Sequence, residues 1–241
     1  MARRPDYGID APAHLRRLAA ASLVSLAVAA GGALVGLTLV VVVVAALIAV
    51  VCGAAAVARL ATSRIGKVRE RERLLDLAAL EGDEVLLDVG CGRGLLVVGA
   101  AKRLPAGEAV GVDTWSRKDL SSNTPAGPPH NARVEGVKVQ VETGDARDLP
   151  FDDGTFDVVV SSNVLHNLDG PGTRRRAIRE IDRVLKPAGR LVLCDISHTD
   201  EYVAALRGAG WRRVERSDLV FRLFPPFRYV VGAKLEVRAT N

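Results

Sequence analysis

Three glycines at alternate positions lie between two short apolar runs, in the sequence Val85-Leu-Leu-Asp-Val-Gly-Cys-Gly-Arg-Gly-Leu-Leu96. Gly90, Gly92 and Gly94 let the backbone turn sharply and let a ligand approach it without side chains in the way. The N–H groups that open a following helix attract anions, aided by the helix dipole. A strand, a glycine turn and a helix therefore predict a site for the carboxylate or phosphate of a ligand.

An aspartate ends the next predicted strand, about twenty residues after the glycine turn, in Val110-Gly-Val-Asp-Thr-Trp115. A carboxylate there can accept hydrogen bonds from both hydroxyls of an adenosine ribose, as in several adenosine-containing cofactors. The glycine spacing is Gly-x-Gly-x-Gly, with Leu95 where the dinucleotide fingerprint has its third glycine. This spacing disfavours a nicotinamide cofactor, although a nicotinamide-dependent oxidoreductase stays open as an alternative.

Short apolar runs alternate with helical patterns along the second part of the chain. Seven runs are predicted to be strands, at residues 85–89, 109–113, 137–141, 156–161, 190–196, 211–215 and 229–237. The segments between the first five are long enough for crossover connections, which indicates an α/β fold with a mostly parallel sheet and helices on both faces. The clearest helix is predicted over 173–186, with its arginine run at 174–176 facing solvent. The segment 116–133 is rich in proline and is predicted to be a mobile loop.

Five motifs, taken in chain order, carry a resemblance to a known family. They are Leu87-Asp-Val-Gly-Cys-Gly-Arg-Gly94, Gly111-Val-Asp-Thr114, Gly144-Asp-Ala-Arg-Asp-Leu-Pro-Phe151, Phe156-Asp-Val-Val-Val-Ser-Ser-Asn-Val-Leu-His166 and Arg183-Val-Leu-Lys-Pro-Ala-Gly-Arg190. The set resembles the class I S-adenosylmethionine-dependent methyltransferases, especially the type 11 branch that includes ubiquinone and menaquinone biosynthesis methyltransferases. The resemblance covers about residues 84–237. It implies a Rossmann-like fold and S-adenosyl-L-methionine as cofactor.

The resemblance also implies cofactor-binding roles for nine positions: Asp88, Gly90, Gly92, Gly94, Asp113, Thr114, Asp145, Ala146 and Asn163. Asp88 and the glycine loop would hold the methionine end of the cofactor, and Asp113 would bind the ribose hydroxyls. Asp145 with Ala146 would contact the adenine edge, and Asn163 would line the methionine end near the sulfonium. Structural alternatives stay open, namely a strand-end cap for Asp113, a turn residue for Asp145 and a helix cap for Asn163.

His166 is the candidate catalytic residue, because an imidazole titrates near neutral pH and can act as a general base. A packing role is its alternative, since histidine is common at this place in the resembled family. The implied reaction is in-line attack of a substrate oxygen, nitrogen or carbon on the sulfonium methyl, which releases S-adenosylhomocysteine. The protein would mainly position the reactants and exclude water.

The three cysteines are widely spaced, so neither a disulfide framework nor a metal site is expected.

Residues 18–58 are 41 consecutive positions without a charged side chain. As one helix they would be about 60 Å long, twice the roughly 30 Å hydrocarbon core of a bilayer, which favours two spans over one. The run is also too long for a signal peptide. Basic residues flank it on both sides, so the positive-inside tendency places both flanks in the cytoplasm. We expect a helical hairpin that turns near Gly31, Gly32 or Gly36; a long buried helix of a soluble protein is the alternative.

The predicted organisation is a basic cytoplasmic N-terminus at 1–17, two transmembrane helices within 18–58, a linker and amphipathic helix at 59–82, and a methyltransferase domain at 83–241. The net charge is +5, and much of the excess flanks the apolar run, which indicates anionic lipid rather than nucleic acid as a partner. We therefore expect a multi-pass protein of the cell (inner) membrane, with its catalytic domain in the cytoplasm.

The acceptor is expected to be a lipophilic small molecule, lipid-like or quinone-like. A methyltransferase tethered to a bilayer would gain little from the tether if its substrate were soluble. Phe221, Phe224 and Phe227 surround Pro225–Pro226 late in the chain, where they could enter the membrane interface or line an apolar pocket. Packing on the domain's own core is the alternative for these phenylalanines. A membrane scaffold that keeps the fold without catalysis is the alternative for the whole chain.

Overall fold

The structure is a computed structural model that describes residues 4–234. Its described residues form two compact units. The sheet unit holds the residues up to Tyr7, Val68–Ser116 and the residues from Asn123 onward, and the hairpin unit holds Gly8–Lys67 with Arg117–Ser122. The residues just before the apolar run are therefore divided between the two units.

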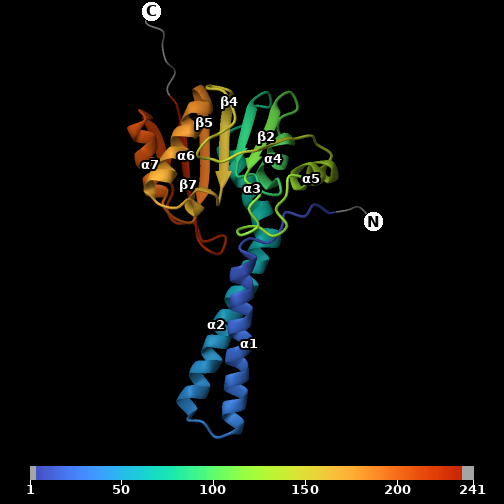
Figure 1. Ribbon diagram of the computed structural model, residues 1–241, viewed down its shortest axis with the longest axis vertical. Coiled ribbons are helices and arrows are strands. Elements are labelled where there is room, and N and C mark those ends of the chain that lie inside the picture. The colour runs from blue at the N-terminus through green and yellow to red at the C-terminus, as the bar shows by residue number, and fades with distance from the viewer. Residues whose placement is uncertain (1–3, 235–241) are drawn as a thin grey trace, which may run out of the picture. The chain divides into compact units, whose positions relative to one another are not determined.

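A seven-stranded sheet forms the centre of the sheet unit (Figure 1). Its strands are β1 (Val85–Val89), β2 (Glu108–Asp113), β3 (Gln140–Thr143), β4 (Phe156–Ser162), β5 (Leu185–Asp195), β6 (Arg213–Arg216) and β7 (Arg228–Ala233). Their order across the sheet is β3-β2-β1-β4-β5-β7-β6, with β1 to β5 parallel and β7 antiparallel to both of its neighbours. The predicted α/β class and seven-stranded, mostly parallel sheet are confirmed.

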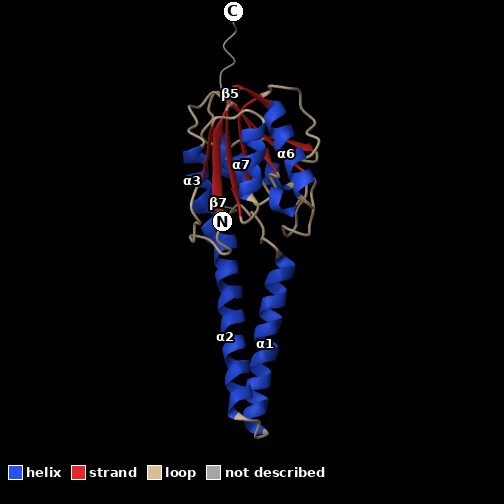
Figure 2. Ribbon diagram, turned by 90° about the vertical axis from the view of Figure 1, so that its left-hand side faces the viewer, coloured by secondary structure: helices blue, strands red, loops and turns tan. Residues whose placement is uncertain are grey.

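Helices cover both faces of this sheet, with α3 on one face and α6 and α7 on the other (Figure 2). The helices are α3 (Lys67–Leu77), α4 (Leu95–Ala101), α5 (Gly127–Glu135), α6 (Pro171–Val184) and α7 (Thr199–Gly208). Successive side chains of a strand point to opposite faces. Leu86 of β1 accordingly packs in the core with α3 and α4, whereas Leu87 packs in the core with α6 and α7. These two apolar layers hold the strand ends in fixed positions.

Two expectations about this unit were wrong. The segment 116–133 is not loop throughout, because α5 begins at Gly127 with prolines in its first turn. The N–H groups in the first turn of a helix have no carbonyl partner within the helix. A proline there, which lacks an N–H, therefore loses no hydrogen bond and can begin a helix. Arg174 does not face solvent, since its side chain is buried and donates to both carboxylate oxygens of Glu201 at 2.8 and 2.9 Å.

The hairpin unit contains two long apolar helices, α1 (Pro12–Leu34) and α2 (Leu39–Ala61), followed by a π-helical turn, η1 (Thr62–Gly66). Both ribbon views show α1 and α2 side by side (Figures 1 and 2). Gly36, at φ +74°, lies in the turn that joins them, which confirms one of the three predicted turn positions. Small residues make the contact: the Ser22 hydroxyl donates to the Ala49 carbonyl at 2.8 Å.

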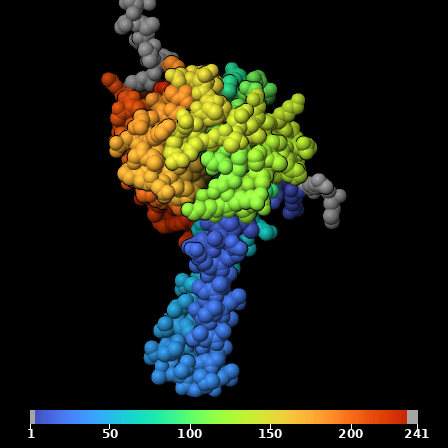
Figure 3. All heavy atoms as spheres, in the orientation of Figure 1, coloured from blue at the N-terminus to red at the C-terminus, as the bar shows by residue number. Residues whose placement is uncertain are grey.

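Large apolar side chains on α1 and α2 point away from the helix pair, with Leu34, Leu39 and Val50 at 88%, 76% and 68% exposure. Each helix is long and apolar enough to cross a bilayer, and only 11% of its most apolar stretch is buried. Figure 3 shows the atoms of α1 and α2 packed side by side. This exposure argues against the alternative of buried helices in a soluble core.

The two ends of the hairpin are joined by polar contacts inside the hairpin unit. The Asp10 carboxylate accepts hydrogen bonds from the Ser63 hydroxyl at 3.1 Å and from the Lys67 ammonium at 3.2 Å. Lys67 also donates to the Gly8 carbonyl at 2.8 Å. The residues that enter and leave the helix pair therefore lie next to each other.

Candidate functional site

The strand order reverses direction between β1 and β4, which are neighbours although two further strands lie between them in the chain. In open α/β sheets, ligands bind outside the carboxyl ends of the strands at such a switch point. The glycine loop follows β1, and Asn163 follows β4. A Cβ atom on Gly90 would lie 2.2 Å from the Val164 side chain, so the loop packs directly against the residues after β4.

The glycine loop has left-handed backbone at each of its three glycines, with φ of +75°, +54° and +87° for Gly90, Gly92 and Gly94. A side chain at Gly94 would also meet the Pro128 backbone at 2.9 Å. The N–H groups of Gly90 and Cys91 donate to the Val112 carbonyl at 2.8 and 3.1 Å. The loop is therefore held to the end of β2, and only glycine suits these positions.

Asp113 ends β2 and connects three segments of the site. One carboxylate oxygen accepts from Gly92 N–H at 2.8 Å, and the other accepts from Trp115 N–H at 2.6 Å and from the Asn123 amide at 3.1 Å. Asn123 is buried, and its role could not be predicted from the sequence because it lies in a segment without a periodic apolar pattern. Thr114, the next cofactor candidate, is exposed beside this carboxylate.

Asp88 lies beneath the loop, on β1, and is 2% exposed. Its carboxylate accepts a hydrogen bond from Val97 N–H at 3.0 Å. Burial, assisted by repulsion from nearby Asp113, raises the pKa of Asp88 to about 8. A cation bound within reach would favour the ionised form of this carboxylate.

The third motif is connected to the same strand end, because Gly144 N–H donates to the Asp113 carbonyl at 3.2 Å. The neighbouring Asp145 carboxylate accepts from the guanidinium of Arg147 at 2.9 and 2.6 Å, and this contact lowers the pKa of Asp145. Ala146 is buried beside it. The structure thus brings the glycine loop, Asp113 and the Asp145–Ala146 pair to one end of the sheet.

His166 faces a carboxylate that sequence reasoning missed. It lies in a short 3₁₀ turn, η2 (Leu165–Asn167), with its Nδ1 2.5 Å from Oδ1 of Asp195 at the end of β5. Asp195 is 2% exposed and also accepts from His166 N–H, from Ile196 N–H and from the Tyr202 hydroxyl, at 3.0, 2.9 and 3.0 Å. Burial and this carboxylate raise the pKa of Tyr202 well above its usual value.

Nδ1 of His166 thus faces the Asp195 carboxylate, without the alignment of a hydrogen bond, and Nε2 lies on the other side of the ring. The signal that could have indicated Asp195 was its place at the carboxyl end of a predicted strand. Asn163, three residues before His166, is exposed, at φ +57°, with its N–H bonded to the Cys194 carbonyl at 2.8 Å.

Cys91 has a packing role within the glycine loop. Its thiol is buried, and burial raises its pKa well above the usual value, so it is a poor nucleophile. Gly111 provides the space for it, since a Cβ there would lie 2.7 Å from the sulfur.

Comparison with known families decides among the cofactors that this geometry could hold. Residues 87–193 match the family described as "Methyltransferase domain". These residues form a methyltransferase domain. S-adenosyl-L-methionine is the methyl donor of that family, which confirms the enzyme class and the cofactor expected from the sequence. The result favours a methyltransferase over the nicotinamide-dependent alternative.

The methyltransferase domain has relatives among known proteins and structures. The chain is 29% identical over 168 residues to a demethylmenaquinone methyltransferase of Lactobacillus johnsonii, covering 69% of this chain but only 62% of that protein. The fold matches that of the [4+2]-cyclase SpnF with a TM-score of 0.59 at 21% identity, over 70% of this chain and 81% of that one. It also matches an S-adenosylmethionine-dependent methyltransferase from Aquifex aeolicus, with a TM-score of 0.54 at 19% identity, over 70% and 92% of the two chains. These two likenesses show the fold alone.

Proposed function

We propose that this protein is a membrane-anchored methyltransferase that transfers a methyl group from S-adenosylmethionine to a lipophilic small molecule. The observation that carries the proposal is the convergence of the glycine loop, Asp113 and Asp145 at one end of the sheet, in a domain of the methyltransferase family. The acceptor and the anchoring are argued separately below.

In the proposed complex, the three acidic residues bind different parts of the cofactor. Asp113 accepts the ribose hydroxyls, because its carboxylate is only half-buried. Asp88 lies below the methionine end, where the ammonium group of the cofactor stabilises its ionised form. Asp145 and Ala146 contact the adenine edge, for which the exposed Arg147 side chain rotates away. The glycine loop and Asn163 line the methionine end.

His166 acts as the general base in the proposed mechanism. S-adenosylmethionine would supply an activated methyl group, and Nε2 of His166 would take the proton that the acceptor nucleophile releases when it is methylated. Asp195 keeps the ring in orientation through Nδ1. The protein adds positioning and exclusion of water, since the methyl donor is already activated.

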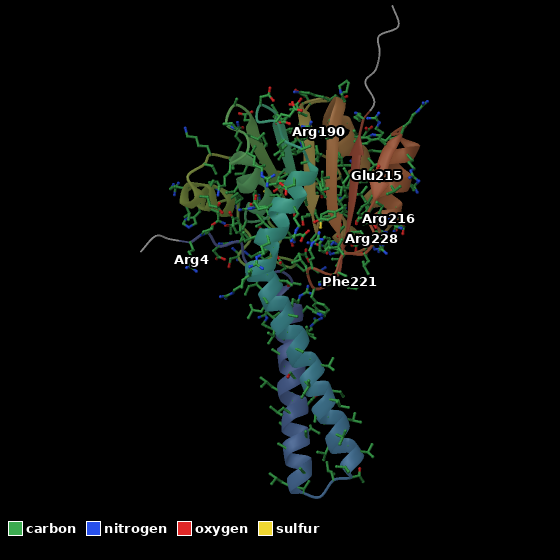
Figure 4. All side chains as sticks on the ribbon, turned by 180° about the vertical axis from the view of Figure 1, so that it is seen from behind. Arg4, Arg190, Glu215, Arg216, Phe221 and Arg228 are labelled. Carbon is green, nitrogen blue, oxygen red and sulfur yellow. The ribbon has the colours of Figure 1, made fainter. Side chains whose placement is uncertain are left out.

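The loop between β6 and β7 supports an apolar acceptor. Asp195 is paired with Arg228, so this loop lies at the carboxyl end of β5, the same edge of the sheet as His166. Figure 4 shows Phe221 at the end of the sheet where β7 begins at Arg228, away from Arg190 at the other end. Leu219, Phe221 and Phe224 are 36%, 75% and 42% exposed there. Phe227, by contrast, is buried, as the packing alternative expected for it.

The named activity of the Lactobacillus johnsonii relative, on demethylmenaquinone, fits a quinone-like acceptor. That protein extends beyond the part which this chain matches, so the likeness supports the class of acceptor only. Comparing the lipids and quinones of cells with and without the protein by untargeted mass spectrometry would identify the acceptor by its missing methyl group.

A contact within the sheet unit supports an even number of membrane crossings. Tyr7 precedes the helix pair and Arg71 follows it, yet the Arg71 guanidinium donates to the Tyr7 hydroxyl at 3.3 Å and lies 5.9 Å from the centre of its ring. Chain segments in contact lie on one side of a bilayer. The two helices, each about 35 Å long, would therefore cross the roughly 30 Å core out and back, with both flanks in the cytoplasm.

Removal of the helix pair tests the anchoring. Residues 12–61 can be replaced by a four-residue Gly-Ser linker of about 13 Å, because Asp10 and Ser63 are hydrogen-bonded. We expect turnover of the acceptor in native membranes to fall about tenfold or more, by loss of effective concentration, with unchanged affinity for S-adenosylhomocysteine. Equal turnover by both forms would exclude the anchoring role.

Reporter fusions test the topology independently. A reporter that is active only in the cytoplasm should give a signal both before Met1 and after Asn241. A signal from one end alone would show a single crossing.

A further inference from the structure

Asp6, a residue of the sheet unit that precedes α1 in the chain, packs beside the glycine loop. Asp6 lies beside Arg93, the residue between Gly92 and Gly94: the Arg93 guanidinium donates to the Asp6 carbonyl at 2.7 Å and to its carboxylate at 2.9 Å. The Arg93 side chain is only 13% exposed, whereas the Asp6 carboxylate is 72% exposed. A chain segment far from the loop in sequence therefore supports it in space.

Asn131 of α5 joins these two residues. It is fully buried, and its side-chain amide accepts from Asp6 N–H and donates to the Asp6 carbonyl, both at 2.9 Å. Its second donor bond goes to the Arg93 carbonyl, also at 2.9 Å. The buried Asn131 amide pairs with both the N–H and the carbonyl of Asp6. If Asp6 moved away, the polar atoms of the Asn131 side chain would lose these partners, so Asn131 favours the docked position of Asp6.

The next residue extends the contact. The Tyr7 hydroxyl donates to Glu135, and Arg71 donates to the same carboxylate at 3.3 Å. Burial and the Glu135 carboxylate raise the pKa of Tyr7 well above its usual range, so the phenol stays protonated and keeps donating.

A second set of contacts, within the hairpin unit, holds the loop that follows Asp113. Ser121 N–H donates to the Ile9 carbonyl at 3.0 Å, and Ala11 N–H donates to the Asp119 carbonyl at 2.7 Å. The Ser121 hydroxyl accepts from Ile9 N–H at 2.7 Å. This loop lies between Trp115 and Asn123, which both donate to the Asp113 carboxylate.

We propose that residues 6–11, the strap, position the cofactor site: Asp6 holds the glycine loop through Arg93 and Asn131, and Ile9 to Ala11 hold the loop after Asp113. The proposal rests on the methyltransferase domain and its cofactor, not on the acceptor. Asp6, Arg93 and Asn131 are positioning residues, because they act through the backbone of the loop. Binding of the cofactor and docking of the strap then favour each other.

The test uses the full chain in lipid nanodiscs and measures the dissociation constant of S-adenosylhomocysteine by calorimetry. Asn131→Leu, which removes three hydrogen bonds, should raise this constant about tenfold or more, and Asp6→Ala about threefold. Asp6→Asn, which keeps an acceptor for Arg93, should recover most of the loss. Asp153→Ala is the matched control, an exposed carboxylate paired with Arg183 at 2.8 Å, and should leave the constant unchanged.

Melting temperatures separate positioning from simple support of the fold. A strap that only stabilises the fold would lower the melting temperature of Asn131→Leu and leave cofactor affinity as in the wild type, which would overturn the proposal. A wild-type chain that does not bind S-adenosylhomocysteine would contradict both this proposal and the proposed function.

Hydrogen exchange on the unmodified chain gives a second measurement that does not depend on how the variants fold. If the strap and the cofactor site are coupled, saturating S-adenosylhomocysteine should slow exchange of the Asp6 amide about threefold or more, by reciprocity. An unchanged exchange rate, with the cofactor bound, would overturn the proposal.

Discussion

Asp113 and Asp195 each end a parallel strand at the same edge of the sheet, yet their surroundings differ. Asp113 is half-buried, and two of its three donors are backbone N–H groups of flanking loops. Asp195 is 2% exposed and holds the His166 backbone and the Tyr202 hydroxyl. The half-buried carboxylate of Asp113 can exchange hydrogen bonds with a ligand, whereas the buried carboxylate of Asp195 can act on a ligand only through His166.

Removal of the half-buried carboxylate of Asp113 should give the largest effect and tests the comparison most strongly. Asp113→Ala should weaken binding of S-adenosylmethionine about 1,000-fold, because two charge-assisted hydrogen bonds to the ribose are lost. Calorimetry should detect little or no heat. Asp76→Ala is the control, because Asp76 is an exposed aspartate paired with Arg103 at 2.7 Å, and this variant should bind as the wild type does. Normal binding by Asp113→Ala would remove Asp113 from the cofactor site.

Removal of the imidazole should give the next largest effect. His166→Ala should lower kcat about 100-fold, within the range for a general base, and leave the affinity for S-adenosylhomocysteine unchanged. If kcat of His166→Ala stays as in the wild type, the role of His166 is packing.

The buried carboxylate should have a smaller effect, since it acts by orienting the ring. Asp195→Asn should lower kcat about tenfold without changing the affinity for S-adenosylhomocysteine. Tyr202→Phe, which removes one hydrogen bond to Asp195, is the milder companion variant and should lower kcat less. If Asp195→Asn lowers the affinity for S-adenosylhomocysteine and leaves kcat unchanged, Asp195 contributes to cofactor binding and not to the orientation of His166.

The last effect concerns the stability of the fold rather than binding or turnover. Below about pH 3.8, Asp88 is protonated in both states; between that pH and 8, only the unfolded chain ionises it, so the folded state loses stability as pH rises. Asp88→Asn removes this loss. The stability difference between variant and wild type should therefore grow by up to about 1.4 kcal/mol per pH unit between pH 5 and 8.

Urea denaturation at several pH values measures this difference. A cofactor ammonium that ionises Asp88 should also make binding release protons near pH 7, which calorimetry in buffers of different ionisation enthalpy detects. A constant difference, without proton release, would mean that Asp88 is ionised throughout.

Local patterns account for what the sequence predicted well. The glycine loop, Asp113 and the strand alternation depend on short-range geometry, and β1, β2 and β4 lie within one residue of their expected bounds at either end. β3 begins at Gln140, three residues after its predicted start, and α6 begins at Pro171, two residues before its predicted start. These shifts occur at element ends, where the apolar pattern is weakest.

Contacts between distant residues could not be predicted in this way. The carboxylate of Asp195 meets His166 only because β4 and β5 are neighbours in the sheet. Asn123 and Asn131 lie in a segment whose prolines suggested a loop, and the bond from Asn131 to Asp6 spans 125 residues. No spacing rule in a single sequence indicates such a partner.

That distance of 125 residues also sets an order of events during synthesis. A ribosome that adds 5–20 residues per second needs roughly 6–25 s to make the chain between Asp6 and Asn131. The start of the chain therefore has no docking surface while the two apolar helices emerge. Asp6 can dock only after α1, α2 and the residues up to Asn131 have been made.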